Sequence, residues 1–273
     1  MAKKITIPEF KLYKQENRRY TMITVYDYVT ARLVDESKIE SILVGDSLGN
    51  IVYGLDSTTP VTLDMMILSI QAVVRGAPNT FIVGDMPFGS YNESCEQAIR
   101  SANRLIKEGG CDCVKLEGGI EMADKISAIV KSGTPVMGHI GLTPQTAAAS
   151  GGMKVQGRTY ETAQKLIEDI VAIEQAGAFS CLVECVPVSV GKAMNEAVSI
   201  PLFSGGAGPD GSGFGLNFYD MFGFFGRAPK FVKHYAELRE TFIEGLNAFR
   251  DDVNNKVYPS PEQCYNMKVE GFE

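Results

Sequence analysis

The sequence predicts an α/β fold, a single (β/α)8 barrel with a short N-terminal leader and a C-terminal helix and tail. Short β-branched, apolar runs alternate evenly with longer amphipathic runs, which is the pattern of parallel strands joined by crossover helices. With 273 residues, 45% of them hydrophobic, the chain has the length of one large barrel domain, which we expect over residues 1–273. No Gly-x-Gly-x-x-Gly turn follows the first expected strand, so a doubly wound sheet is the less favoured alternative.

Seven segments have the length and apolar character of buried parallel strands. They are residues 21–27, 41–46, 80–85, 111–117, 135–139, 179–184 and 200–204. A barrel needs an eighth strand to close, and the only place left for it is about residues 215–219, where the sequence is aromatic and broken by glycine.

Amphipathic segments between these strands predict the crossover helices. They are residues 62–75, 94–108, 121–131, 159–176, 189–197 and 229–250. Ser94 and Gln97 have the spacing of a capping box, and glycines such as Gly133 and Gly177 stand where a helix has to end. Residues before 21 are expected to form a polar leader, and those after about 256 a tail.

Composition and charge exclude several classes of function. The formal net charge is −7 and the pI is near 5.1, and we find no cluster of Lys and Arg of the kind that binds nucleic acid or an anionic membrane. No apolar run has the length of a signal-peptide core or of a membrane span of about 18 residues. The six cysteines form no Cys-x-x-Cys pair and are expected to be buried apolar side chains. We therefore expect a soluble, cytoplasmic protein.

Ionisable residues stand at the carboxyl ends of six consecutive predicted strands. They are Asp27, Asp46 followed by Ser47, Asp85, Lys115 with Glu117, His139 and Glu184. Core packing alone does not produce such a series. In a barrel these strand ends converge on one rim, where active sites are built from several strands at once.

Lys115 and Glu117 share one face of the fourth strand, because side chains alternate along a strand. A Lys and a Glu that point into a barrel have to pair or bind a ligand, since an isolated buried charge is costly. A purely structural ion pair is therefore one interpretation of these two residues, and ligand binding is the other.

Asp46, Asp85 and Glu117 supply hard oxygen ligands without a nearby Cys or His pair, which is the ligand chemistry of Mg²⁺ rather than of Zn²⁺. Three neighbouring carboxylates would repel one another without a cation. Capping or loop hydrogen bonds are the alternative for each residue singly. Mg²⁺ gives up water reluctantly, so water or a chelating substrate would complete its coordination.

Three further features have both a functional and a structural interpretation. His139 ends an apolar strand, where it either hydrogen-bonds a substrate or packs at the edge of the core. Glu184 is a lone acid in an apolar strand, and is either a general base or the partner of a barrel lysine. The glycine-rich segment 205–208 is similar to a phosphate-cradling turn, but glycines at a strand end also serve tight turns.

Several motifs occur together and in one order. They include Thr24-Val-Tyr-Asp27, Leu43-Val-Gly-Asp-Ser-Leu-Gly49, Val114-Lys-Leu-Glu-Gly-Gly119, Gly138-His-Ile-Gly-Leu-Thr-Pro-Gln145, Lys154-Val-Gln-Gly-Arg158 and Leu182-Val-Glu-Cys-Val-Pro187. On these motifs the chain resembles the ketopantoate hydroxymethyltransferase (3-methyl-2-oxobutanoate hydroxymethyltransferase) family, barrel enzymes of pantothenate biosynthesis related to the phosphoenolpyruvate mutase and isocitrate lyase group. The resemblance is dense over residues 5–208.

The resemblance implies one Mg²⁺ ion, 5,10-methylenetetrahydrofolate as one-carbon donor, a 2-oxo acid substrate and a cytoplasmic homo-oligomer, typically a homodecamer. It also implies a role for each candidate residue. The family's metal site corresponds to Asp46, Asp85 and Glu117. Its oxo-acid site corresponds to Asp46, Ser47, Asp85, Lys115 and His139, and its catalytic proton acceptor corresponds to Glu184.

After Gly208 the chain departs from the family pattern, through about residue 226. In the family this region helps to line the site near the cosubstrate. The departure favours an alternative function, a folate-independent C–C lyase or decarboxylase that acts on another 2-oxo acid with the same Mg²⁺–enolate site. A non-catalytic barrel is a third hypothesis, against which the retained set of ionisable residues argues.

Overall fold

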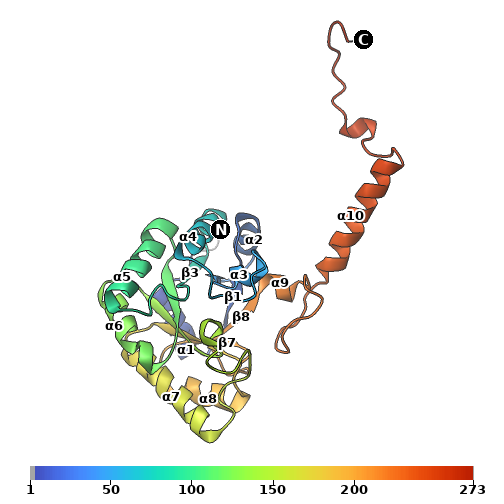
Figure 1. Cartoon of the computed structure of the whole chain (residues 1–273). Helices are drawn as coiled ribbons and strands as arrows, with labels where there is room; N and C mark the ends of the chain where they lie inside the picture. Colours follow the sequence, from blue (N-terminus) through green and yellow to red (C-terminus); the bar gives the residue numbers. More distant parts are fainter. Residues whose placement is uncertain (1–3, 273) are drawn as a thin grey trace. The chain divides into compact units, whose positions relative to one another are not determined.

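Eight parallel strands close into a barrel in the computed structural model, which describes residues 4–272 (Figure 1). Each strand pairs with the next along the chain, and β8 pairs with β1. The strands are β1 (Tyr20–Thr24), β2 (Ser41–Val44), β3 (Phe81–Asp85), β4 (Cys113–Glu117), β5 (Val136–Gly141), β6 (Ser180–Glu184), β7 (Leu202–Gly205) and β8 (Gly213–Asn217). The predicted α/β barrel is confirmed, and the doubly wound alternative is wrong.

Helices surround the strands on the outside of the barrel (Figure 1). They are α2 (Tyr28–Asp35), α3 (Leu48–Ile51), α4 (Leu63–Gly76), α5 (Cys95–Arg104) with the π-helical turn η1 (Leu105–Gly109), α6 (Ala123–Lys131) after the 3-10 turn η2 (Ile120–Met122), α7 (Tyr160–Gln175) and α8 (Val188–Ala197). The helices predicted between residues 62 and 197 are confirmed, with small shifts at their ends. No helix in the described part of the chain is long and apolar enough to cross a membrane.

The N-terminal cap of α5 forms only in part as predicted. The Ser94 hydroxyl accepts a hydrogen bond from the Gln97 N–H at 3.1 Å. The Gln97 side chain accepts a hydrogen bond from the Glu93 N–H at 3.0 Å. In a capping box it would accept from the N–H of the capping residue itself, Ser94. The reciprocal bond is therefore displaced by one residue.

The predicted polar leader is wrong, because residues 7–15 form the helix α1 (Ile7–Gln15). Thr6 and Glu9 form a capping box, in which the Thr6 N–H donates to the Glu9 carboxylate at 2.7 Å. Phe10 on this helix is buried against Tyr20 and Phe81, with ring centroids 4.9 and 5.1 Å away. Both partners begin a strand, so α1 closes the amino-terminal end of the barrel.

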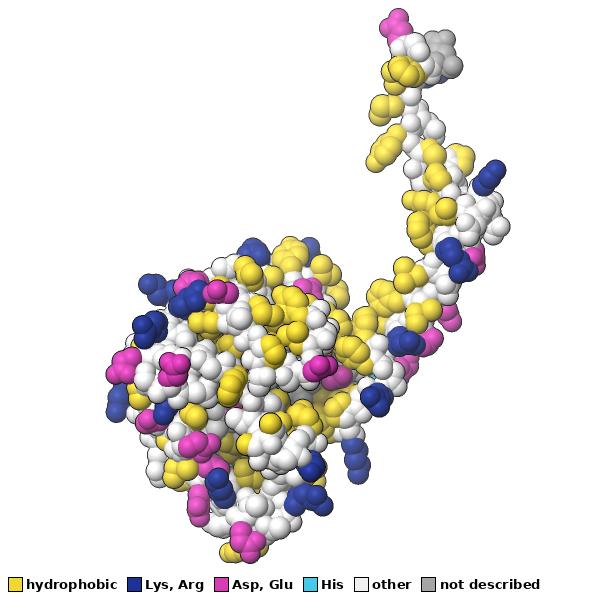
Figure 2. Space-filling view, in the orientation of Figure 1, with side chains coloured by type: hydrophobic (Ala, Val, Ile, Leu, Met, Phe, Trp, Pro, Cys, Tyr) yellow, Lys and Arg dark blue, Asp and Glu magenta, His cyan; other side chains and the backbone are white. Residues whose placement is uncertain are grey.

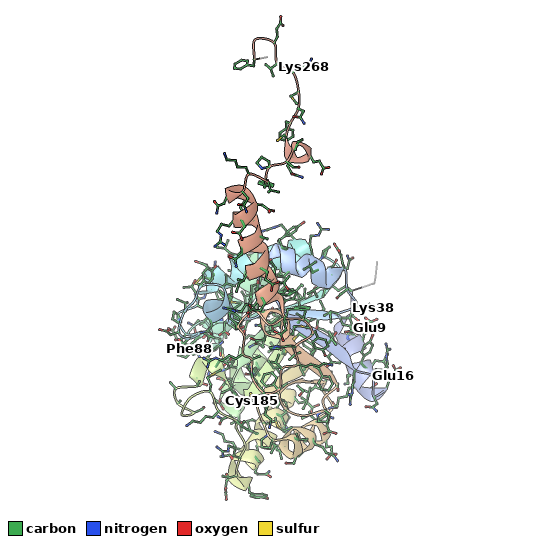
Figure 3. The ribbon with its side chains drawn as sticks, turned by 90° about the vertical axis from the view of Figure 1, so that its right-hand side faces the viewer. Glu9, Glu16, Lys38, Phe88, Cys185 and Lys268 are labelled. Atoms are coloured by element: carbon green, nitrogen blue, oxygen red, sulfur yellow. The ribbon has the colours of Figure 1, made fainter. Side chains whose placement is uncertain are left out.

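The two ends of the barrel are therefore different. Figure 3 shows Glu9 and Glu16, at α1, on one side of the barrel and Phe88 and Cys185, which follow the carboxyl ends of β3 and β6, on the other. With the amino-terminal end closed by aromatic packing, the polar strand ends occupy the opposite mouth.

The chain divides into two compact units, one up to Phe218 and one from Tyr219 onward. The second unit contains the short helix α9 (Phe218–Met221) at its start, α10 (Leu238–Asn254) and the 3-10 turn η4 (Pro261–Gln263). The expectation of one domain over residues 1–273 stays a prediction.

The helix predicted over residues 229–250 is wrong at its start, because α10 begins at Leu238. The Tyr235 and Leu238 N–H groups donate to the carbonyls of Met221 and Phe222, so the residues before α10 form a loop and not a helical turn. No residue of α10 is buried, and Figure 2 shows hydrophobic side chains along it.

Candidate active site

The predicted ionisable residues from β3 to β6 come together at the mouth of the barrel. Strand register places Asp85 beside Lys115, Glu117 beside His139, and Gly141 beside Glu184. Asp46 follows β2, and its N–H donates to the Asp85 carboxylate at 3.1 Å. Of this set only Glu184 is partly exposed, with 22% of its side chain accessible.

Lys115 lies at the centre of this cluster and is 2% exposed. Its Nζ lies 2.7 Å from Asp85 Oδ1, 3.3 Å from His139 Nδ1 and 3.9 Å from Glu117 Oε1. Burial alone would lower the pKa of the ammonium group, but the surrounding carboxylates outweigh burial and raise the pKa above its usual range. Lys115 is therefore a fixed positive charge.

Asp46 and Asp85 are buried side by side. Burial is the main cause that raises the pKa of both carboxyl groups, and repulsion from neighbouring carboxylates adds to it, while Lys115 opposes the shift. Asp85 Oδ1 pairs with Lys115 and makes no hydrogen bond of normal geometry in residues 4–272. The two carboxylates therefore favour an added positive charge.

His139 connects the two sides of the mouth. Its Nδ1 lies 3.2 Å from Glu117 Oε1, and its Nε2 lies 3.4 Å from Glu184 Oε2. Burial and the charge of Lys115 would lower the pKa of His139, but Glu117 and Glu184 raise it to about 9. The pKa of Glu117 is lowered, because its attraction to His139 and Lys115 outweighs the effect of burial. His139 and Glu117 therefore stabilise each other in the charged form.

The backbone around Glu184 has two residues in the left-handed region. Cys185, which follows it, has φ +49°, and Gly141 on the neighbouring strand has φ +93°. The Glu184 carbonyl accepts the Leu142 N–H at 2.8 Å, and a Cβ at position 141 would lie 2.2 Å from that same carbonyl oxygen. Gly141 therefore permits the close approach of β5 and β6 that holds Glu184 at the rim.

Ser47 and Asp27 have different surroundings. The Ser47 hydroxyl lies 2.8 Å from the Tyr26 hydroxyl, which also accepts a hydrogen bond from the Asn217 amide, so the ends of β1, β2 and β8 meet there. Asp27 caps α2 by accepting from the Val29 and Thr30 N–H groups. Asp27 thus braces the loop after β1.

Sequence reasoning missed Gln145 and Tyr91, both buried at the mouth. The Gln145 amide donates to Asp46 Oδ2 at 2.9 Å, and its backbone N–H donates to Glu117 Oε2 at 3.0 Å. The only sequence signal was that Gln145 ends the Gly-His-Ile-Gly-Leu-Thr-Pro-Gln motif. Nothing in the sequence marked Tyr91.

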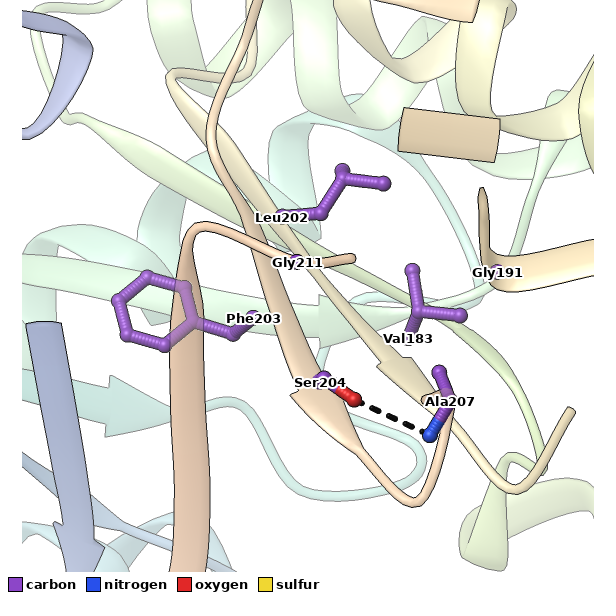
Figure 4. Close-up of a pocket in the computed structure, with 7 residues that line it drawn as sticks. All are labelled: Val183, Gly191, Leu202, Phe203, Ser204, Ala207 and Gly211. Atoms are coloured by element: carbon purple, nitrogen blue, oxygen red, sulfur yellow. Dashed lines mark hydrogen bonds between the residues drawn. The ribbon is translucent and has the colours of Figure 1, made fainter. Parts of the chain in front are cut away.

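The glycine-rich turn after β7 serves packing. The Ser204 hydroxyl accepts the Ala207 N–H at 3.1 Å and donates to the Gly208 carbonyl at 2.9 Å, beside the small cavity in Figure 4. A Cβ at Gly191 of α8 would lie 2.1 Å from the Ala207 carbonyl oxygen. Because Ser204 already takes the Ala207 N–H of this turn, the tight-turn interpretation holds and a phosphate cradle has no support.

The mouth provides the oxygen chemistry that Mg²⁺ prefers, but not a preformed cage. Within residues 4–272 no group of three or more His, Cys, Asp or Glu side chains is arranged to hold a metal ion. Mg²⁺ commonly takes only one or two protein carboxylates and fills its remaining positions with water and substrate. The adjacent carboxylates of Asp46 and Asp85 fit that mode, whereas Glu117 is engaged by His139 and Gln145.

The fold defines a class of protein before any sequence relative is considered. Phosphonopyruvate hydrolase in a complex with oxalate and Mg²⁺ is similar in structure, with a TM-score of 0.62 at 12% identity, covering 94% of this chain and 93% of that one. A 2,3-dimethylmalate lyase of the phosphoenolpyruvate mutase/isocitrate lyase superfamily is similar with a TM-score of 0.57 at 13% identity, covering 96% and 91%. The chain has the barrel fold of these enzymes.

Sequence comparison then identifies the family. The family model described as ketopantoate hydroxymethyltransferase matches residues 4–261, and the chain belongs to this family. A 3-methyl-2-oxobutanoate hydroxymethyltransferase of Heliobacterium modesticaldum is 55% identical, covering 99% of this chain and 98% of the relative. Enzymes of the same name from Clostridium novyi and Geobacillus kaustophilus are 48% and 46% identical, covering 97% and 96% of this chain and 96% and 94% of their own lengths.

Proposed function

We propose that this chain transfers a hydroxymethyl group from 5,10-methylenetetrahydrofolate to 3-methyl-2-oxobutanoate and forms 2-dehydropantoate, a reaction of pantothenate biosynthesis. The observation that carries the proposal is the cluster at the barrel mouth, where a partly exposed carboxylate, Glu184, lies 3.4 Å from His139, which in turn contacts the buried Lys115 beside Asp85. Full-length relatives that bear this enzyme name support it.

The proposed reaction balances without an oxidant or a reductant. The C3–H bond of the oxo acid breaks, and a bond forms between C3 and the folate methylene carbon. Both C–N bonds of that methylene group break, and its new hydroxyl group comes from water. The proton from C3 and the other hydrogen of the water end on the two folate nitrogens, so tetrahydrofolate leaves.

Glu184 is the proposed proton acceptor for the C3–H bond. Its carboxylate stands at the rim, where a bound substrate can reach it, and His139 Nε2 lies 3.4 Å away. A general base has to lie within hydrogen-bond reach of the proton that it takes, and the position of Glu184 at the end of β6, next to His139, supports this role.

Binding of the oxo acid is assigned to the residues around Lys115. The proposed substrate-binding residues are Asp46, Ser47, Asp85, Lys115 and His139. Lys115 is the buried positive charge closest to Asp85, and it would stabilise both the substrate carboxylate and the enolate that forms when the C3 proton leaves.

The proposed metal is one Mg²⁺ ion, held by Asp46 and Asp85 with Glu117 beside it. When bound, the ion would supply positive charge to the keto and enolate oxygens of the oxo acid. Support comes from the hydrogen bond that joins Asp46 to Asp85 and from the ion-paired, otherwise unbonded oxygen of Asp85.

Two measurements test the function. Purified protein, incubated with 3-methyl-2-oxobutanoate, 5,10-methylenetetrahydrofolate and Mg²⁺, should form 2-dehydropantoate; no product beside an active control enzyme would refute the proposal. Proton NMR in D₂O should show exchange at C3 without folate. Glu184→Gln should abolish that exchange but retain oxo-acid binding, and retained exchange would remove Glu184 from the base role.

The alternative function, a folate-independent lyase, has no specific support in this chain, since the full-length relatives of the chain carry the transferase name.

We also propose a cytoplasmic homo-oligomer, with the decamer as the expected form. The exposed side chains of Phe242, Leu246 and Phe249 on α10 support association, because apolar side chains grouped at a surface are typical of protein interfaces. Light scattering of the full chain, giving its molar mass, tests this assembly.

A further inference from the structure

One fully hydrogen-bonded side chain at the mouth has no part in the chemistry above. Gln145 lies in the 3-10 turn η3 (Pro144–Thr146), directly after β5, and is 4% exposed. Its Nε2 donates to Asp46 Oδ2 and to the Met86 carbonyl, each at 2.9 Å. Its Oε1 accepts the Tyr91 hydroxyl at 2.6 Å. Every hydrogen of the amide group is therefore used.

These contacts fix the orientation of the amide. Asp46 Oδ2 and the Met86 carbonyl are both acceptors, so the NH₂ group has to face them. The opposite orientation would place the Gln145 oxygen against two acceptors and leave the donors without these partners. The amide therefore presents donors to Asp46 and cannot present an acceptor without loss of both bonds.

Tyr91 holds the other end of the amide. Its hydroxyl lies 2.6 Å from Gln145 Oε1 and accepts the Glu117 N–H at 3.2 Å. Tyr91 is 1% exposed, and burial raises the pKa of its hydroxyl well above the usual range. The hydroxyl also lies 3.2 Å from the Glu117 carbonyl, and its shorter contact, to Gln145 Oε1, holds the amide.

The same residue also contacts the second carboxylate. The backbone N–H of Gln145 donates to Glu117 Oε2 at 3.0 Å, while Glu117 Oε1 faces His139. One residue on the loop after β5 thus contacts carboxylates that belong to the ends of β2 and β4. A hydrogen bond from a neutral donor to a buried carboxylate is stronger than one between neutral groups, and it restricts the rotation of that carboxylate.

We propose that Gln145, held by Tyr91, is a positioning residue that sets the direction of the Asp46 and Glu117 carboxylates for binding of the divalent ion and the 2-oxo acid. The inference rests on the proposed function, because it assigns those ligands to the mouth. Gln145 touches neither reacting atom in this scheme and acts through the carboxylates that it orients.

Two variants and a matched control test the inference. Gln145→Met keeps the approximate length of the side chain but removes the donors that face Asp46 and the Met86 carbonyl, without adding a charge. Tyr91→Phe removes only the hydroxyl that holds the amide. Gln175→Met, at the exposed end of α7, makes the same change away from the mouth.

The first readout is independent of turnover. Electron paramagnetic resonance of Mn²⁺, titrated with and without 3-methyl-2-oxobutanoate, gives the dissociation constant of the ion. We expect Gln145→Met to weaken Mn²⁺ binding by about 10- to 100-fold, as for loss of a hydrogen bond to a charged group, and Tyr91→Phe to weaken it by about 3- to 10-fold. Gln175→Met should match the unmodified protein.

Steady-state kinetics give the second readout. Tyr91→Phe should raise KM for the oxo acid with little change in kcat, because the substitution alters positioning and leaves Glu184 in place. Tyr91→Phe should add little further loss in a Gln145→Met background, since both substitutions break one chain of hydrogen bonds.

The outcomes separate this inference from the function on which it rests. If the unmodified protein binds Mn²⁺ and the oxo acid and both mouth variants bind them equally well, Gln145 has no positioning role. If the unmodified protein makes no 2-dehydropantoate yet the variants lose Mn²⁺ affinity, the proposed function fails and the positioning role stands. Should Gln145→Met fail to fold, Tyr91→Phe decides alone, and unchanged Mn²⁺ affinity and KM in that variant would overturn the inference.

Discussion

Gly141→Ala is expected to displace Glu184 through the backbone. A Cβ at this position would lie 2.2 Å from the Glu184 carbonyl oxygen, a distance at which one of the two strands has to move. The residue also has φ +93°, which a side chain makes unfavourable. The substitution therefore combines backbone strain with a clash against the strand that carries the proposed base.

The magnitude follows from these two effects. A left-handed backbone conformation costs about 1–2 kcal/mol for a residue with a Cβ. Loss of the hydrogen bond from the Leu142 N–H to the Glu184 carbonyl adds about 1–3 kcal/mol, because it leaves a buried group without its partner. Gly141→Ala should thus lower the free energy of unfolding by about 2–5 kcal/mol. A shift of about 1 Å in Glu184 should slow C3 proton exchange by roughly 100-fold.

Gly133→Ala is the matched control. Gly133 has φ +100°, but a Cβ there meets no atom within 4 Å. The Gly133→Ala substitution should therefore lower the free energy of unfolding only by the backbone strain, about 1–2 kcal/mol, and leave C3 proton exchange unchanged. Urea unfolding followed by far-UV circular dichroism measures stability, since the chain has no Trp, and NMR in D₂O measures exchange. Equal losses of stability and normal exchange in both variants would refute the reasoning.

Four other predictions concern packing, charge, thiols and metal. Phe10→Ala should cost about 3–5 kcal/mol in urea unfolding, because it empties the aromatic cluster that closes the barrel; a loss under about 1 kcal/mol would mean that α1 is not part of the core. Lys115→Met removes the positive charge among buried carboxylates and should cost about 3–5 kcal/mol and abolish calorimetric binding of the oxo acid; retained binding would contradict its assigned role. Burial raises the pKa of Cys185 to about 11, which reduces its thiolate fraction at pH 8. A thiol reagent should therefore modify the exposed Cys264 before Cys185. Mass spectrometry of digests shows the order of modification, and faster reaction at Cys185 would contradict the prediction. Removal of divalent ions with EDTA should stop C3 exchange, and added Mg²⁺ should restore it; exchange that persists without metal would exclude the proposed metal site.

The barrel and most of its charged mouth could be predicted because both depend on local patterns. Apolar runs that end in Asp85, in Lys115 and Glu117, or in Glu184 are visible along the chain, and parallel strand order then brings their ends together. The helix α1 also has a local signature in the sequence, the capping-box spacing of Thr6 and Glu9.

Other features have no local pattern. Gln145 contacts Asp46 across 99 positions of sequence and Tyr91 across 54, and neither separation follows from a helical or strand period. The start of α10 was placed too early because the N–H groups of Tyr235 and Leu238 donate to the carbonyls of Met221 and Phe222, which depends on where the chain turns. Contacts of this kind depend on tertiary structure.

The balance of charge at the mouth explains why an added cation and an anionic substrate should bind together. Four carboxyl groups, those of Asp46, Asp85, Glu117 and Glu184, surround two groups that can carry positive charge, Lys115 and His139. A 2-oxo acid brings a further negative charge, so binding of the acid without a cation would leave uncompensated charge in a buried site. A divalent cation offsets that charge. The raised pKa of Asp46 and Asp85 has the same origin, because burial and mutual repulsion favour any positive partner at those oxygens. Removal of the metal should therefore weaken oxo-acid binding itself as well as the proton transfer that follows it.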